Sequence, residues 1–185
     1  MHKDIKEILI SENEIQNKSA ELGKIISYDY QGKKPVLVGL LKGCVPFLAE
    51  LIKHLDIDLE YDFMDVSTYF GGTSSTGRIK ILKDLETDIT NRDILIVEDI
   101  IDTGFTLHKV IPMLKARNPK SIEIVSLLDK PVSRTVEGIV PKYVGFTIPK
   151  LFVVGFGLDY NDFYRNLPYV GILKEEVYNK WNQQL

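Results

Sequence analysis

Along this chain, strongly apolar segments alternate with segments whose apolar residues recur at helical spacing. Residues 36–41 and 94–97 are continuous apolar runs, which predict strands buried on both faces, and 121–128 alternates as a strand. Apolar residues recur at helical spacing over 46–55 and 107–114, directly after the first two strands. Strands that alternate with helices are typical of a mostly parallel, twisted sheet flanked by helices, so we expect an α/β fold.

The amino-terminal segment predicts a covering helix. Ser11 and Glu14 have the spacing of a capping box, which marks the start of a helix. The apolar stripe of this helix consists of Ile15, Leu22, Ile25 and Ile26. Further strands are expected at 59–69, 78–82, 143–146, 151–155 and 170–173, with a short helix ending near residue 181.

A glycine-rich and hydroxyl-rich loop, residues 70–77, separates two of these strands. It predicts either a long hairpin tip or a lid that closes over a site, and we favour a lid over about residues 67–78. No linker, repeat or change of composition divides the chain, so residues 1–185 are expected to form a single domain.

The composition excludes several classes of protein. The net charge of -3 disfavours a general nucleic-acid-binding surface. The single cysteine, Cys44, excludes an intrachain disulfide framework and fits a reducing cytoplasm. The three histidines show no metal-ligand spacing, and no apolar run approaches the length of a membrane span. We therefore expect a cytoplasmic protein.

Polar residues with a common chemistry follow the strand 93–97. The segment holds three acids, two threonines and a glycine: Glu98, Asp99, Asp102, Thr103, Gly104 and Thr106. Residues 103–106 lie at the amino end of a predicted helix, where free N–H groups and the helix dipole favour a phosphate. The two upstream acids would repel that phosphate, so we expect them to face hydroxyls or a divalent cation. A ribose phosphate combines these groups.

Two lysines also lie at the carboxyl ends of predicted strands, where ligands gather in open α/β sheets. Lys42 and Gly43 follow the strand 36–41 and would suit a second anion such as pyrophosphate. Lys130 follows the strand 121–128. Neither a dinucleotide-binding glycine motif nor a P-loop is present, which disfavours both of those sites.

Residues 97–106 resemble the phosphoribosyl pyrophosphate (PRPP) signature of the type I phosphoribosyltransferases. Residues 41–43, 67–69, 130 and 152–161 resemble the remaining blocks in the same order, in the branch that uses 6-oxopurines. The resemblance covers about residues 36 to 169. It implies the type I phosphoribosyltransferase fold, with a small hood built from chain-terminal segments. It also implies purine salvage: PRPP with Mg2+ reacts with hypoxanthine or guanine to give IMP or GMP and pyrophosphate.

The resemblance also implies the residues that bind PRPP. Glu98 and Asp99 would hold the ribose hydroxyls, directly or through Mg2+. Lys42 and Gly43 would form the pyrophosphate loop, which often has a non-proline cis peptide in this family. The other assignments are Arg165 to the pyrophosphate, Thr68 and Tyr69 to the lid, and Asp102, Thr103, Gly104, Phe105 and Thr106 to the 5′-phosphate.

The base pocket implied by the resemblance lies beside this site. Lys130 would donate to the 6-oxo oxygen, Phe152 would stack on the ring, and the Val153 backbone would meet the Watson–Crick edge. Asp159 would anchor a second Mg2+ through water. Asp102 would act as general base, taking the proton of purine N7 as N9 attacks the ribose. Where many members carry Asp-Lys before Phe152, this chain has its lysine one residue earlier, at position 150.

Other functions stay open at this point. One is a PRPP-sensing regulator that binds RNA or DNA on the same fold, although the acidic composition counts against nucleic acid. Another is an enzyme of this fold with xanthine, adenine or orotate as its acceptor. The resemblance implies a homodimer or homotetramer whose partners are PRPP and a 6-oxopurine, with neither nucleic acid nor membrane among them.

Overall fold

The computed structural model describes residues 1–69 and 78–181, and at 68, 69, 78, 79, 180 and 181 it describes the backbone alone. Most of the expected lid, residues 70–77, therefore lies outside the described residues. Among the described helices, none combines the length and the apolar composition that crossing a membrane requires.

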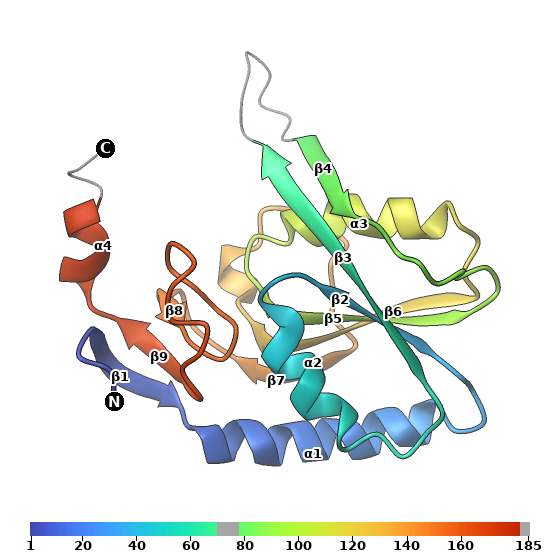
Figure 1. Ribbon diagram of the computed structural model, residues 1–185, viewed down its shortest axis with the longest axis horizontal. Coiled ribbons are helices and arrows are strands. Elements are labelled where there is room, and N and C mark those ends of the chain that lie inside the picture. The colour runs from blue at the N-terminus through green and yellow to red at the C-terminus, as the bar shows by residue number, and fades with distance from the viewer. Residues whose placement is uncertain (70–77, 182–185) are drawn as a thin grey trace.

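A six-stranded sheet forms the centre of the protein, as Figure 1 shows. Its strand order is β4-β3-β2-β5-β6-β7, and every neighbouring pair is parallel except β3 and β4. The predicted α/β fold with a mostly parallel sheet is confirmed. The strands are β2 (Val36–Leu40), β3 (Glu60–Tyr69), β4 (Arg78–Lys83), β5 (Asp93–Ile101), β6 (Ser121–Asp129) and β7 (Tyr143–Thr147).

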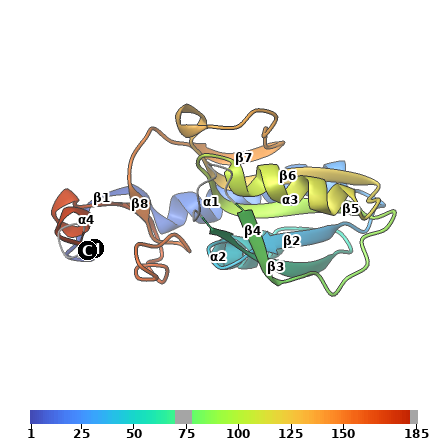
Figure 2. The same cartoon turned by 90° about the horizontal axis from the view of Figure 1, so that it is seen from above.

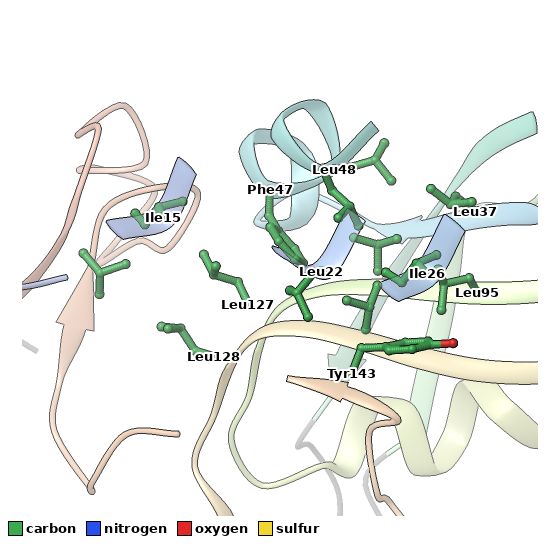
Figure 3. Packing of buried hydrophobic residues seen from close by; sticks show 14 of the residues in the cluster. Ile15, Leu22, Ile26, Leu37, Phe47, Leu48, Leu95, Leu127, Leu128 and Tyr143 are labelled. Atoms are coloured by element: carbon green, nitrogen blue, oxygen red, sulfur yellow. The ribbon is translucent and has the colours of Figure 1, made fainter. Parts of the chain in front are cut away.

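Two hydrophobic cores cover the two faces of this sheet. Leu95 of β5 packs with α1 (Glu12–Asp29) and α2 (Cys44–Ile52) in the first core, part of which is drawn in Figure 3. Ile94 and Ile96 point the other way and pack with α3 (Phe105–Lys115) in the second core. Because both faces are covered, the central strands need apolar residues at every position.

A smaller antiparallel sheet, the hood, joins the two ends of the chain. Its strand order is β1-β9-β8, with β1 (Ile5–Ile10), β8 (Val153–Val154) and β9 (Val170–Leu173). The helix α4 (Glu175–Trp181) follows β9. Figures 1 and 2 both place the hood to one side of the main sheet, which confirms the predicted hood of chain-terminal segments.

Some details differ from the sequence predictions. The capping box at Ser11 is present, but Ile25 is exposed and does not belong to the buried stripe of α1. The strand expected at 151–155 is only two residues long, because a turn with positive φ at Phe156 follows it. The strand β1 was not predicted. A charged residue at Glu7 interrupts its apolar pattern, and its partner β9 is remote in sequence.

Candidate active site

A cleft of about 320 Å³ lies at the carboxyl ends of β2 and β5. These two neighbouring strands are followed by helices on opposite faces of the sheet, which is the position where open α/β sheets bind ligands. The cleft brings together nearly all the residues predicted for PRPP. Its polar lining consists of Lys42, Gly43, Glu98, Asp99, Asp102, Thr103, Gly104, Thr106, Asp159 and Arg165, and Phe105 also lines it.

The predicted phosphate loop forms the entry to α3. Gly104 has a φ of 79° and precedes the first helical residue, Phe105. This left-handed conformation is strained for residues with a Cβ, and a Cβ here would lie 2.9 Å from Cδ of Arg134. The Thr103 hydroxyl accepts a hydrogen bond from the Phe105 amide at 3.3 Å. The loop therefore presents the amino end of a helix to the cleft, as an anion requires.

Glu98 and Asp99 are two consecutive acids of β5, and both line the cleft. Burial, and then the charge of Asp99, raise the pKa of Glu98 well above its usual value. Burial also raises the pKa of Asp99 to about 6, although the Ile100 amide donates to it at 2.8 Å. Among the described residues, no ion pair neutralises either group.

This arrangement fits a divalent cation supplied with the substrate. A cation near two buried carboxyl groups would favour their ionised forms. The described residues contain no group of three or more His, Cys, Asp or Glu that could hold a metal alone. Mg2+ commonly binds through one or two carboxylates, with waters and substrate phosphates as its other ligands, so Glu98 and Asp99 suffice.

The Lys42–Gly43 loop lies directly against these acids. The peptide bond between Leu41 and Lys42 is cis, as the family resemblance implied. A Cβ at Gly43 would overlap the carboxylate of Asp99, so a side chain at this position would displace that carboxylate. A Cβ at Gly157, which has a φ of 99°, would overlap the Gly43 carbonyl oxygen. The loop that contains Gly157 and the Lys42–Gly43 loop therefore touch backbone to backbone.

Arg165 lies on the hood side of the same cleft. It donates to the Gly157 carbonyl at 2.8 Å and forms ion pairs with Asp159 at 2.9 Å and Asp162 at 3.1 Å. Its Nε is buried and has no hydrogen-bond partner among the described residues. Arg165 is thus held by groups on the hood side while it lines the cleft.

A second cavity, of about 640 Å³, lies between the end of β6 and the hood. Asp102 and Thr103 line both this cavity and the first cleft, so the two are adjacent. The side chain of Lys130 is almost fully buried, and its ammonium lies 3.4 Å from Oδ2 of Asp102. The other lining residues are Val132, Ser133, Arg134, Thr135, Lys150, Leu151, Phe152 and Tyr178.

Phe152 contributes an aromatic wall to this second cavity. It is exposed, and its ring is stacked against that of Tyr178 with centroids 5.2 Å apart and an interplanar angle of 30°. Tyr160 meets the Phe152 ring edge-on at 5.6 Å. The side chain predicted to stack on a purine is thus held by α4, and Tyr178 lines the cavity beside it.

Four predicted residues lie elsewhere or are only partly described. Val153 is buried in the hood and does not line the second cavity. Asp159 was placed in the base pocket by the resemblance, but it lines the first cleft and not the second cavity. The backbones of Thr68 and Tyr69 end strand β3 beside β4, but their side chains lie outside the described residues.

Arg134 is a site residue that the sequence did not reveal. Its guanidinium donates to the Asp102 carbonyl at 2.8 Å and forms a largely buried ion pair with Asp129. It therefore ties the phosphate loop to the residue preceding Lys130. The only sequence signal was an arginine four residues after Lys130. Its contacts depend on the short 3₁₀ turn at Pro131–Ser133, which the sequence pattern did not predict.

The fold and the cleft are those of a protein that binds a phosphorylated ribose, and comparison with known proteins agrees. A model of the phosphoribosyl transferase domain matches residues 4–161. The chain therefore belongs to the phosphoribosyl transferase family.

Relatives within this family confirm the predicted branch. A hypoxanthine-guanine phosphoribosyltransferase of Lactococcus lactis is 59% identical over 180 residues, which cover 97% of each chain. The crystal structure of a hypoxanthine phosphoribosyltransferase from Staphylococcus aureus has a TM-score of 0.92 at 55% identity and covers 96% of each chain. A ternary substrates complex of the Trypanosoma cruzi hypoxanthine phosphoribosyltransferase has a TM-score of 0.90 at 37% identity, covering 96% of this chain and 100% of that one.

Proposed function

We propose that the protein transfers the phosphoribosyl group of PRPP to hypoxanthine or guanine, giving IMP or GMP and pyrophosphate. This is the purine-salvage reaction classified as EC 2.4.2.8. The observation that carries the proposal is the contact of Lys130 with Asp102 where the two cavities meet. One cavity offers a phosphate loop and acids, and the other offers an ammonium and an aromatic ring.

PRPP would occupy the first cleft. The amino end of α3, with Thr103 and Thr106, would hold the 5′-phosphate, and Glu98 and Asp99 would hold the ribose hydroxyls or a bound cation. The Lys42–Gly43 loop and Arg165 would hold the pyrophosphate. Mg2+ bound with PRPP would neutralise charge on the phosphates and on the departing pyrophosphate.

The base would lie in the second cavity between the phosphate loop and the hood. Lys130 would donate to its 6-oxo oxygen while Phe152 stacks on the ring. Reaction breaks the bond from ribose C1 to the pyrophosphate oxygen and forms the bond from C1 to N9. Asp102 would take the proton from N7 in this step, and Lys42 with Arg165 would receive the leaving negative charge.

Several further properties belong to this proposal. The metal is Mg2+, with Asp159 placed at the cleft to hold a second ion through water. The protein acts in the cytoplasm, which the single buried cysteine fits. It assembles as a homodimer or homotetramer, which sedimentation velocity would detect.

A pyrophosphate-release assay tests the function. The protein is mixed with PRPP and Mg2+ and, in separate reactions, with hypoxanthine, guanine, xanthine, adenine or orotate. We expect release with hypoxanthine and guanine, and little with adenine or orotate. Fastest release with xanthine would instead favour a xanthine enzyme. No release with any base, together with a salt-dependent shift of labelled RNA or DNA, would support the regulator.

A further inference from the structure

Asp162 occupies the space between the two cations predicted to bind pyrophosphate. A single atom, Asp162 Oδ1, lies 3.4 Å from Nζ of Lys42 and 3.1 Å from a guanidinium nitrogen of Arg165. One carboxylate oxygen therefore bridges two positive groups from opposite sides of the cleft, as a phosphate oxygen would. Hydrogen bonds from Arg165 and then Lys42 lower the pKa of Asp162, so this group is an anion at neutral pH.

The chain holds this carboxylate in place by an unusual turn. Asn161 and Asp162 have φ values of 54° and 64°, a left-handed conformation in which Asn and Asp are enriched. The Asp162 amide donates to Oδ2 of Asp159 at 2.8 Å, and Oδ1 of Asp159 pairs with Arg165. The backbone of Asp162 is thus anchored independently of its own carboxylate.

The side chains of Arg165 and Asp162 differ in how freely they can move. The Arg165 side chain is only 28% exposed and is fixed by Gly157 and Asp159, whereas the Asp162 side chain is 69% exposed. Exposed ion pairs of this kind are weak, because water and salt screen them and ordering the side chains costs entropy. The Asp162 carboxylate can therefore separate from Lys42 and Arg165 while Arg165 keeps its place.

We propose that Asp162 is an internal anion that occupies the pyrophosphate site of the free protein and is displaced by pyrophosphate or by the pyrophosphate group of PRPP. This rests on the proposed function. Asp162 would keep Lys42 near Arg165 when the site is empty, and it would weaken the binding of pyrophosphate by competing for the same cations. Its effect would be to speed the release of this product.

The variant Asp162→Asn removes the charge but suits the left-handed backbone, so it isolates the carboxylate. We expect the inhibition constant of pyrophosphate and the KM for PRPP each to fall about threefold to tenfold, because the competitor is weakened. The difference should shrink at high salt, which screens the exposed pairs. Asp162→Glu keeps the charge on a longer side chain, so it should stay nearer to the wild-type values than Asp162→Asn.

The matched control is Asp58→Asn. Asp58 pairs with Lys34 at 3.4 Å with its side chain 79% exposed, and neither residue lines the cleft. This variant should change neither constant. If Asp162 instead held Lys42 and Arg165 ready for pyrophosphate, Asp162→Asn would raise both constants. Either that rise or unchanged constants would overturn the proposal.

Binding of inorganic pyrophosphate, measured by calorimetry without any base, separates this proposal from the proposed function. If the wild-type protein formed no pyrophosphate with any base, the proposed function would be refuted. Tighter pyrophosphate binding by Asp162→Asn would then still support the internal anion. If the wild-type protein were active and calorimetry showed equal affinities of the wild type and Asp162→Asn for pyrophosphate, only the proposal of an internal anion would be refuted.

Discussion

Lys130 and Asp102 form an ion pair, with Nζ and Oδ2 3.4 Å apart, where the two cavities of the protein meet. On a 6-oxopurine, O6 and N7 are neighbouring atoms of one edge of the ring. A donor for O6 and an acceptor for the N7 proton must therefore lie close together. In the free protein each of these groups neutralises the other, so the buried ammonium of Lys130 has a partner before a base arrives.

Asp102→Asn should lower kcat about 100- to 10,000-fold, because a positioned general base supplies a factor of that size. The KM for PRPP should change by no more than about twofold, because in the proposed function backbone amides at the amino end of α3 would hold most of the 5′-phosphate. Steady-state kinetics with hypoxanthine measures both constants. Unchanged turnover would exclude Asp102 as the base.

Lys130→Met should raise the KM for hypoxanthine and guanine about 10- to 100-fold. It keeps the length of the side chain but removes a charged hydrogen bond, which is worth about 1.5–3 kcal/mol. Adenine lacks the 6-oxo oxygen, so its poor use should change far less. If hypoxanthine were used as well as before, Lys130 would not recognise the 6-oxo group.

Binding of PRPP with Mg2+ should depend on pH through Asp99. Its raised pKa of about 6 means that the folded protein holds a proton there below about pH 6, and a cation must displace it. Affinity should therefore fall about tenfold for each unit of pH below 6.

PRPP itself carries a phosphate that titrates near pH 6, so the useful measurement is the difference between wild type and Asp99→Asn. The variant should bind more weakly at pH 7 but lose the part of the pH dependence that belongs to Asp99, while the part that belongs to Glu98 remains. Equal pH dependence in both proteins would contradict this. In the absence of ligand, protonation of Asp99 favours the folded state. Its contribution to the free energy of unfolding is present near pH 4 and is lost as the pH rises through about 6.

Tyr178→Ala should raise the KM for the base about 2- to 10-fold, because the stack that holds Phe152 is worth about 0.5–1.5 kcal/mol. Tyr178→Phe keeps the ring and should behave as wild type. The KM for PRPP should stay unchanged in both variants, since Tyr178 does not line the first cleft. An equal rise in both KM values would point to a general loss of structure.

Arg134→Ala should lower the free energy of unfolding by about 3 kcal/mol, because it leaves the buried carboxylate of Asp129 without its partner. Removing Asp129 as well should recover part of this loss. Urea unfolding of the two single variants and the double variant measures the coupling. Additive losses would mean that the pair contributes no specific stability.

The sequence predicted the parts of the site that are contiguous in the chain. The phosphate loop could be recognised because the acids, the threonines and Gly104 follow one strand in a fixed order. Lys42 and Lys130 could be placed because each follows a buried strand, and the carboxyl ends of parallel strands share one edge.

Contacts that cross between the hood and the main sheet could not be predicted in this way. Tyr178 supports Phe152 only because β8 and β9 pair, and Asp162 reaches Lys42 only because the hood folds over β2. The pairing of β1 with β9 joins Ile5 to Leu173, and no local pattern carries information about a partner so remote in sequence.

Gly43 and Gly157 have a consequence for the shape of the whole molecule. The hood can approach the sheet only as closely as these two backbones allow, and any side chain at Gly157 would wedge them apart. The hood and the main sheet can thus lie this close only because Gly43 and Gly157 have no Cβ atoms. The substitution Gly157→Ala adds a single methyl group at a residue with no catalytic or binding side chain. It would widen the cleft and move Arg165 away from Lys42.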